Sequence, residues 1–299
     1  MSWQILIEFL GLLPVFIVVG LMTWQKRRIE ADDRREAITT DLRNHPGASL
    51  QAERDKIYEL QMDRMVAAIV IGLLAAMTIV ARRVKEDFST WGWLDSLFLL
   101  VILGAGIYYG RKVMADMPQS RRLKQAIRAE QATAQELAAS LAGDNRIIHD
   151  IEGKDFNIDH VVITPAGIFA VETKSRLKPP ASNGAKAVKV KYNGKQLEFP
   201  GWTETKPVEQ ASRQARWLAN HLRKATGESL PVFVVLSLPG WFIENTARIT
   251  EDMVRVINPK KSQWLLLPEK RPVLLDAAAI HRAAFAIEKL AQQKVPEVR

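Results

Sequence analysis

Two carboxylates and a lysine stand close together in the stretch NIDHVVITPAGIFAVETK, residues 157–174. Apolar runs flank Thr164-Pro165-Ala166-Gly167, where the positions of proline and glycine are typical of a type I turn and predict a β-hairpin. A two-residue tip sets Asp159 opposite Glu172, with Cβ atoms about 4.5–5.5 Å apart. Lys174 follows Glu172 by two residues and therefore shares its face of the strand. We expect a charged cluster at the end of a buried pair of strands.

Such a cluster can carry out metal-assisted hydrolysis of a phosphodiester. Carboxylate oxygens are the ligands that Mg²⁺ and Mn²⁺ prefer, and an ammonium group beside them can position or activate a water molecule. The same residues also fit an ion pair between Glu172 and Lys174 at a strand end, with Asp159 capping a turn. The spacing alone leaves both interpretations open.

The segment IDHVVITPAGIFAVETK resembles the NERD (nuclease-related) domain, a branch of the PD-(D/E)xK, restriction-endonuclease-like superfamily. The resemblance implies that Asp159 and Glu172 bind the metal and that Lys174 is the catalytic lysine. It extends upstream to Glu136, which matches the family's helix glutamate and is implied as a further metal ligand. Downstream it reaches Gln210, which matches the helix glutamine near the family's active site.

This resemblance covers residues 131–222 and implies an α/β fold, a restriction-endonuclease-like mixed sheet flanked by helices. It also implies Mg²⁺ or Mn²⁺ as the cofactor. The sequence departs from the family pattern where Ala132 and Gln135 replace glycines usual before the helix glutamate, and where Lys206 replaces a common asparagine. Neither departure removes a metal ligand.

Three apolar stretches precede this segment, and each has the length needed to cross a hydrocarbon layer of about 30 Å. Tryptophan and tyrosine stand at their ends, as is typical of residues at a membrane interface. We therefore expect an all-α membrane anchor over residues 1–116 and a nuclease-like domain over 117–299. The predicted transmembrane helices, with a charged helical loop at 25–64 after the first, are at about 5–23, 65–81 and 93–109.

Basic residues predict the orientation of this anchor. They are dense in residues 25–64 and again after the third stretch, whereas none precedes the first. The asymmetry places the N-terminus outside the cell (inner) membrane and the C-terminal domain in the cytoplasm, against the opposing evidence of Arg82, Arg83 and Lys85 in the loop predicted outside. Small residues spaced as in Gly106-xxx-Gly110 fit either packing among the spans or a homo-oligomer formed through them.

The net charge of +9 lies entirely in residues 117–299, because acidic and basic residues balance before them. In AVKVKYNGKQLEF, lysines alternate with apolar residues around Asn193-Gly194, which predicts a hairpin with one basic face. Such a face can protect a sheet edge, lie on anionic lipid or contact phosphates, and its position beside the candidate metal site favours phosphates. The residues predicted to bind nucleic acid are Lys178, Lys186, Lys189, Lys191 and Lys195.

The predicted function is that of a membrane-anchored, Mg²⁺-dependent nuclease acting on nucleic acid, with DNA favoured over RNA. The alternative is a membrane-tethered module that binds or senses nucleic acid and has a weak or inactive nuclease site. The chain has no cysteine, which excludes disulfides and thiolate metal ligands, and it has no glycine-rich phosphate loop. Further elements are expected as helices at 119–141, 207–225 and 276–292 and as strands at 231–238 and 253–257.

Overall fold

The computed structural model describes residues 24, 27, 45–86, 92–139, 145–153, 155–179, 188–261 and 272–292. The chain divides into two compact units. One unit comprises Met1–Asp41 and Arg54–Arg121, and the other comprises Leu42–Glu53 and Arg122–Arg299. The second unit therefore includes a short segment from the N-terminal part of the sequence.

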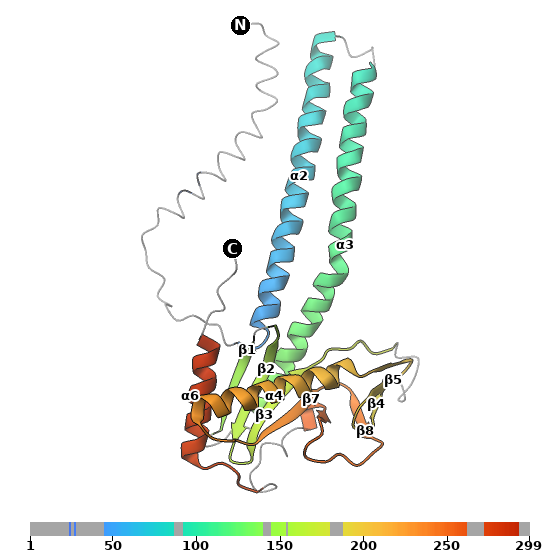
Figure 1. The fold of residues 1–299 in the computed structure, drawn as a ribbon. Coiled ribbons are helices and arrows are strands. Elements are labelled where there is room, and N and C mark those ends of the chain that lie inside the picture. The colour runs from blue at the N-terminus through green and yellow to red at the C-terminus, as the bar shows by residue number, and fades with distance from the viewer. Residues whose placement is uncertain are drawn as a thin grey trace. The chain divides into compact units, whose positions relative to one another are not determined.

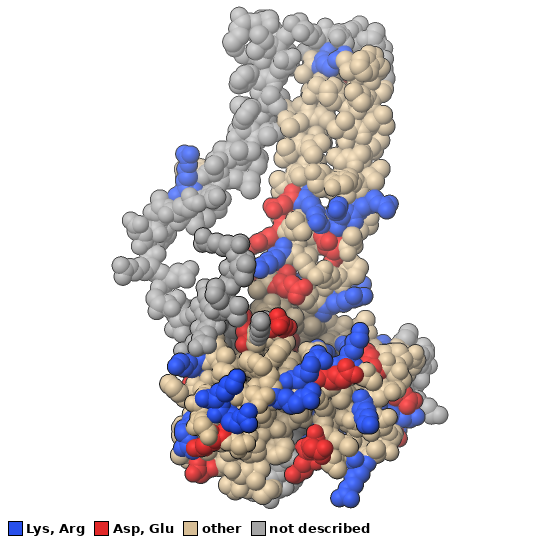
Figure 2. Space-filling view, viewed as in Figure 1, with Lys and Arg blue, Asp and Glu red and all other residues tan. Residues whose placement is uncertain are grey.

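Two long helices dominate the first unit: α2 (Ala48–Glu86) and α3 (Trp93–Ala138). Both are long and apolar enough to cross a membrane, and within the most apolar window of each only 6% of the residues are buried. Figure 2 shows the apolar lengths of both helices as tan surface. They contain the spans predicted at 65–81 and 93–109, so the described residues hold two candidate spans. The span predicted at 5–23 lies outside the described residues.

The structure joins two predicted helices into one. The sequence predicts a span at 93–109 and a separate helix at 119–141, whereas α3 is continuous through both and has Pro118 in its interior. Proline removes one backbone hydrogen bond but does not stop a helix whose residues on both sides favour it. The charged helical loop predicted at 25–64 is likewise continuous with the next span from Ala48 onward, in α2. Most of residues 25–44 lie outside the described part.

The second unit is built on a five-stranded sheet with the order β1-β2-β3-β7-β9 (Figure 1). The first three strands are antiparallel, and β7 and β9 run parallel to β3. The predicted hairpin is confirmed, because Thr164 pairs with Gly167 and Ile163 with Ile168. The strands are β1 (Arg146–Glu152), β2 (Asn157–Thr164), β3 (Gly167–Thr173), β7 (Val232–Ser237) and β9 (Arg255–Ile257).

Helices cover both faces of this sheet. On one face α4 (Lys206–Thr226) and α6 (Ala277–Gln292) bury an apolar cluster that includes Leu218, Leu222 and Ile280. On the opposite face Leu137, from the end of α3, packs against Val162 and Phe169. Mixed α/β layers preceded by a helical region are the fold class that the sequence predicts.

A second, four-stranded sheet lies beside the first, with the order β6-β5-β4-β8. The hairpin predicted around Asn193-Gly194 is confirmed as β4 and β5, with Tyr192 paired to Leu197. Val190 and Tyr192 are buried, so the alternating lysines face outward. The strands are β4 (Lys189–Tyr192), β5 (Leu197–Phe199), β6 (Trp202–Glu204) and β8 (Phe242–Asn245), and a 3-10 turn follows at Pro259–Lys261.

Candidate active site

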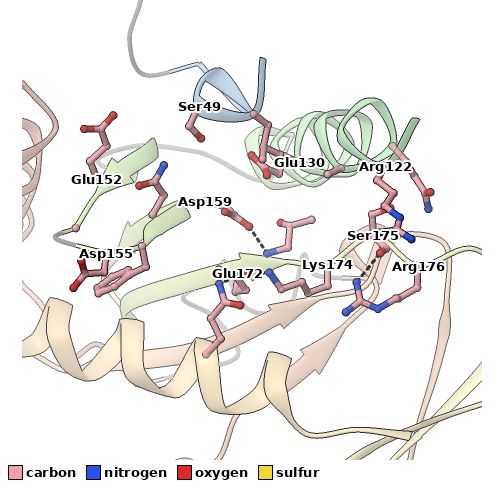
Figure 3. A pocket seen from close by; sticks show the side chains of 18 of the residues that line it. Ser49, Arg122, Glu130, Glu152, Asp155, Asp159, Glu172, Lys174, Ser175 and Arg176 are labelled. Carbon is pink, nitrogen blue, oxygen red and sulfur yellow. Dashed lines mark hydrogen bonds and ion pairs between the residues drawn. The ribbon is translucent and has the colours of Figure 1, made fainter. Parts of the chain in front are cut away.

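A pocket of about 1050 Å³ opens where β2 and β3 approach α3 and α4. Its wall includes Asp159 of β2 with Glu172 and Lys174 at the end of β3. Glu130 of α3 lies across the same space (Figure 3). All four of these residues belong to the second unit. The structure thus brings together the three residues of the predicted D…ExK cluster and adds a third carboxyl.

The hairpin register sets Asp159 beside Glu172. The last regular pair is His160 with Val171, so the next position outward on each strand is Asp159 and Glu172. Asp159 accepts a hydrogen bond from the backbone N–H of Thr173, at 2.6 Å from N to Oδ2. This bond fixes the Asp159 carboxylate at the mouth of the hairpin, facing the pocket.

Glu172 is 2% exposed and its carboxylate is held from three directions. Lys174 Nζ lies 2.5 Å from Oε1, and the Gln210 amide donates to the same oxygen at 2.8 Å. Gln214 donates to Oε2 at 2.6 Å and also to the carbonyl of Asn157. Gln210, placed at the site by the resemblance, thus contacts Glu172, and Gln214 one helical turn later is a second contact that the sequence did not identify.

Glu130, not Glu136, is the helix glutamate that lines the pocket. Glu136 lies six residues further along α3 and is not part of the pocket wall. A sequence signal for Glu130 existed, because it fills a gap in the buried stripe of Leu123, Ile127 and Leu137 at helical spacing. A glutamate within an apolar stripe must be buried, and a buried charge is costly unless it is paired or binds a metal.

The carboxyls of this pocket exceed its positive charge. Burial raises the pKa of Glu130 from 4.5 to about 8, with further increases from Asp150 and Glu172. Burial likewise raises the pKa of Asp159 well above its usual value, and the charges of Glu172 and Glu130 add to this. Lys174 opposes both shifts as the nearby cation. Two buried carboxyls and a half-buried one around one ammonium would be stabilised by a further cation.

Hard oxygen donors of this kind suit Mg²⁺ or Mn²⁺. In the part of the chain that the structure describes, however, no three acidic or histidine side chains are arranged at the distances of metal ligands. Lys174 and the two glutamines occupy the oxygens of Glu172. The donor set fits a divalent cation chemically, and binding requires Lys174 to move from Glu172.

Glu130→Gln is expected to stabilise the protein in the absence of divalent cations, increasingly at high pH. A carboxyl whose pKa is higher folded than unfolded favours folding below pH 4.5 and loses that contribution as the pH rises through about 8. The loss is at most about 1.4 kcal/mol for each unit of pKa difference. Glutamine does not titrate, so the melting temperature of the variant should exceed that of the wild type more at pH 9 than at pH 5. An equal difference at both values would show that Glu130 is not a buried acid.

Glutamates offset the predicted basic face of the second sheet. Lys189 Nζ lies 3.8 Å from Glu244, and Lys191 Nζ lies 3.6 Å from Glu198 on the neighbouring strand. Figure 2 shows Lys and Arg interspersed with Asp and Glu on the visible face of this unit. Lys178 and Lys195 are exposed, and Lys186 lies outside the described residues. The cations that line the pocket itself are Arg122, Lys174 and Arg176.

Comparison with known proteins gives one match. Residues 125–239 match the family described as the nuclease-related domain, NERD. No curated protein and no solved structure is detectably similar to the chain. The matched range contains the end of α3, the β1-β2-β3 hairpins, α4 and β7. It therefore includes Glu130, Asp159 and Glu172, the three carboxyls of the candidate site. Residues 125–239 of this chain are therefore a nuclease-related (NERD) domain.

Proposed function

We propose that the protein is a membrane-anchored nuclease that uses a divalent metal ion to hydrolyse phosphodiester bonds. The observation that carries the proposal is the convergence of Glu130, Asp159, Glu172 and Lys174 on one open pocket within a nuclease-related domain. Three elements supply them, since Glu130 comes from α3, Asp159 from β2 and the others from the end of β3. Pockets that gather buried acids with shifted pKa values are candidate catalytic centres.

Asp159, Glu172 and Glu130 would hold Mg²⁺ or Mn²⁺. Such an ion, when bound, polarises the phosphate and lowers the pKa of a bound water. Gln210 and Gln214 orient the Glu172 carboxylate by donating to its two oxygens. Lys174, once displaced from Glu172, has its ammonium group in the pocket, where it can orient the attacking water or stabilise the charge that develops on the phosphate. Arg122 can bind a neighbouring phosphate, because it lines the same pocket.

Metal binding can be tested without measuring activity. Mn²⁺ should raise the melting temperature of the full chain, since a ligand at 100 times its Kd stabilises the folded state by about 2.7 kcal/mol. Glu172→Gln and Glu130→Gln should each remove most of this shift, whereas Glu198→Gln, with an exposed carboxyl on β5, should not. An unchanged shift in both pocket variants would reject these acids as the ligands.

The second candidate function, a tethered binder of nucleic acid with a silent site, has one specific observation in its favour. The oxygens of Glu172 are fully engaged by Lys174, Gln210 and Gln214, so the buried carboxylate is satisfied without a metal. In that case Mn²⁺ would leave the melting temperature unchanged while nucleic acid still bound. A measurement of metal affinity therefore distinguishes the two functions.

The membrane part of the proposal rests on α2 and α3. Both helices contain a candidate span, and the segments at their outer ends, Leu42–Glu53 and Arg122–Arg299, belong to one compact unit. Ser49 ties the first segment to this unit, because its N–H and hydroxyl donate to Asp150 at 2.8 and 2.9 Å. If α2 crosses the membrane away from this unit and α3 crosses back to it, the residues that join the two helices lie on the opposite side of the membrane from the unit. We infer a cytoplasmic nuclease-like unit and an external connection near residues 87–91.

This topology is expected to show in cysteine labelling, which is clean because the chain has no native cysteine. A membrane-impermeant maleimide should label Ser89→Cys in intact cells and should label Lys195→Cys, on the exposed β4-β5 turn, only after lysis. Labelling of Lys195→Cys from outside would place the nuclease-like unit on the external face and contradict a cytoplasmic substrate. Labelling of neither before lysis would contradict the crossing by α2 and α3.

A further inference from the structure

An aromatic side chain stands at the rim of the candidate active site. Trp202 of β6 lines the same pocket as Glu172, Lys174 and Arg176, and it remains 36% exposed. The neighbouring Trp241, by contrast, is fully buried. The exposed indole therefore presents apolar surface to a pocket whose other side is charged.

One face of the Trp202 ring is covered and the ring is held in place. Phe199 stacks on it with centroids 4.8 Å apart and planes inclined by 4°. Trp241 meets it edge-on at 6.5 Å. Because Phe199 covers one face, the opposite face is the one that can receive a flat ligand. A ring already fixed in this way loses little conformational entropy on binding.

Glu204 couples this ring to the charged side of the pocket. Its Oε1 accepts a hydrogen bond from the Trp202 indole N–H at 2.8 Å and another from Arg176 Nε at 2.8 Å. Its Oε2 accepts from Arg176 Nη2 at 2.6 Å. One carboxylate therefore positions an aromatic face and a guanidinium group side by side at the opening that leads to Lys174.

A ligand that uses both features needs a flat ring next to a phosphate. A nucleotide unit has both, whereas a lipid tail or an apolar peptide would find Arg176 and the acids of the pocket unfavourable. A base inside a duplex already stacks on its neighbours and exposes no face, so the ring can receive only an unpaired base. Resting on the proposed nuclease function, we propose that Trp202 is a stacking platform for an unpaired base beside the scissile phosphate. The substrate is then single-stranded nucleic acid, or a strand end or gap with single-stranded character.

The test is a binding measurement on the full chain in detergent, in a chelator so that no cleavage occurs. Fluorescence anisotropy would compare a labelled single-stranded oligonucleotide with a duplex of the same sequence. Trp202→Ala should weaken binding of the single strand about 5- to 150-fold, the range for loss of one stacked base. Trp202→Phe, which keeps a ring face, should retain most of the affinity, and binding of the duplex should be unaffected by either change. Phe242→Ala is the matched control, because it removes an aromatic ring that is 47% exposed on the same sheet and does not line the pocket.

A second arm uses the oligonucleotide itself. In a series of oligonucleotides that each lack one base, loss of the base at one position should weaken binding by the wild type. The same loss should not further weaken binding by Trp202→Ala. Equal affinity of wild type and Trp202→Ala for single strands, equal losses in the Ala and Phe variants, or no binding of single strands by the wild type would each overturn the proposal. Failure of the nuclease function would be a separate result. Single-strand binding would still depend on Trp202 and on one base, but no metal-dependent cleavage would occur.

Discussion

Glu172→Gln is expected to reduce phosphodiester cleavage by at least about a thousandfold, since a metal ion contributes several kcal/mol of charge stabilisation in the transition state. The substitution preserves size but removes the negative charge on which a hard cation depends. It also places an amide N–H₂ against donors, because Lys174, Gln210 and Gln214 all donate to the native carboxylate. We therefore expect a small loss of stability, about 1–3 kcal/mol, beside the loss of activity.

The control for this experiment must separate inactivity from unfolding. Glu198→Gln changes a carboxyl whose side chain is 56% exposed on the second sheet, and it should leave both cleavage and melting temperature unchanged. Binding of nucleic acid by Glu172→Gln should be retained, since a negative charge near the phosphates has been removed. Cleavage by this variant within tenfold of the wild-type rate would mean that Glu172 holds no catalytic metal.

Lys174→Met should have opposite effects on two properties. Cleavage should fall about 10²- to 10⁴-fold, the range that is typical for loss of a positioned general acid or base. Metal affinity should stay the same or increase, because Lys174 lies 2.5 Å from the Glu172 oxygen that the metal would need. Without metal the variant should be less stable, since the cation that opposes the raised pKa values of Glu130 and Asp159 is gone.

Lys289→Met, in the exposed last turn of α6, is the matched control for Lys174→Met. It removes a lysine of the same unit and should alter neither cleavage nor Mn²⁺ affinity. A parallel loss of cleavage and metal affinity in Lys174→Met would show that this lysine acts by shaping the site. Cleavage by Lys174→Met at the wild-type rate would show that Lys174 has no part in the mechanism.

The centre of the site could be predicted because its geometry is local. A two-residue tip at Pro165-Ala166 fixes the register of the hairpin, and the register fixes Asp159 beside Glu172. The period of α4 similarly brings Gln210 and Gln214 to the same side of the helix, one turn apart. In both cases the spacing along the chain determines which side chains meet.

The outer parts of the site depend on contacts between distant segments, which spacing does not encode. Trp202 lines the pocket because β6 joins the second sheet. Strands as short as β6 and β8 have no periodicity by which the sequence could predict them. The acids beside the predicted basic face come from distant segments in the same way. The acids that neutralise Lys189 and Lys191 come from β8 and β5, outside the lysine-rich stretch itself. Glu130 is different, because its position in the buried stripe of α3 is visible in the sequence, whereas Glu136 is implied only by the family resemblance.

The most direct test of the proposed nuclease activity is cleavage by the full chain in detergent, because Ser49 of α2 contacts Asp150 of the nuclease-like unit and a shorter fragment would lack this contact. Single- and double-stranded DNA and RNA would each be incubated with Mn²⁺ or Mg²⁺ and, separately, with a chelator. We expect cleavage of at least one single-stranded substrate with metal, none in the chelator, and none by Glu172→Gln. Binding of nucleic acid without metal-dependent cleavage of any substrate, with Glu172→Gln indistinguishable from wild type, would contradict the nuclease and favour the tethered binder.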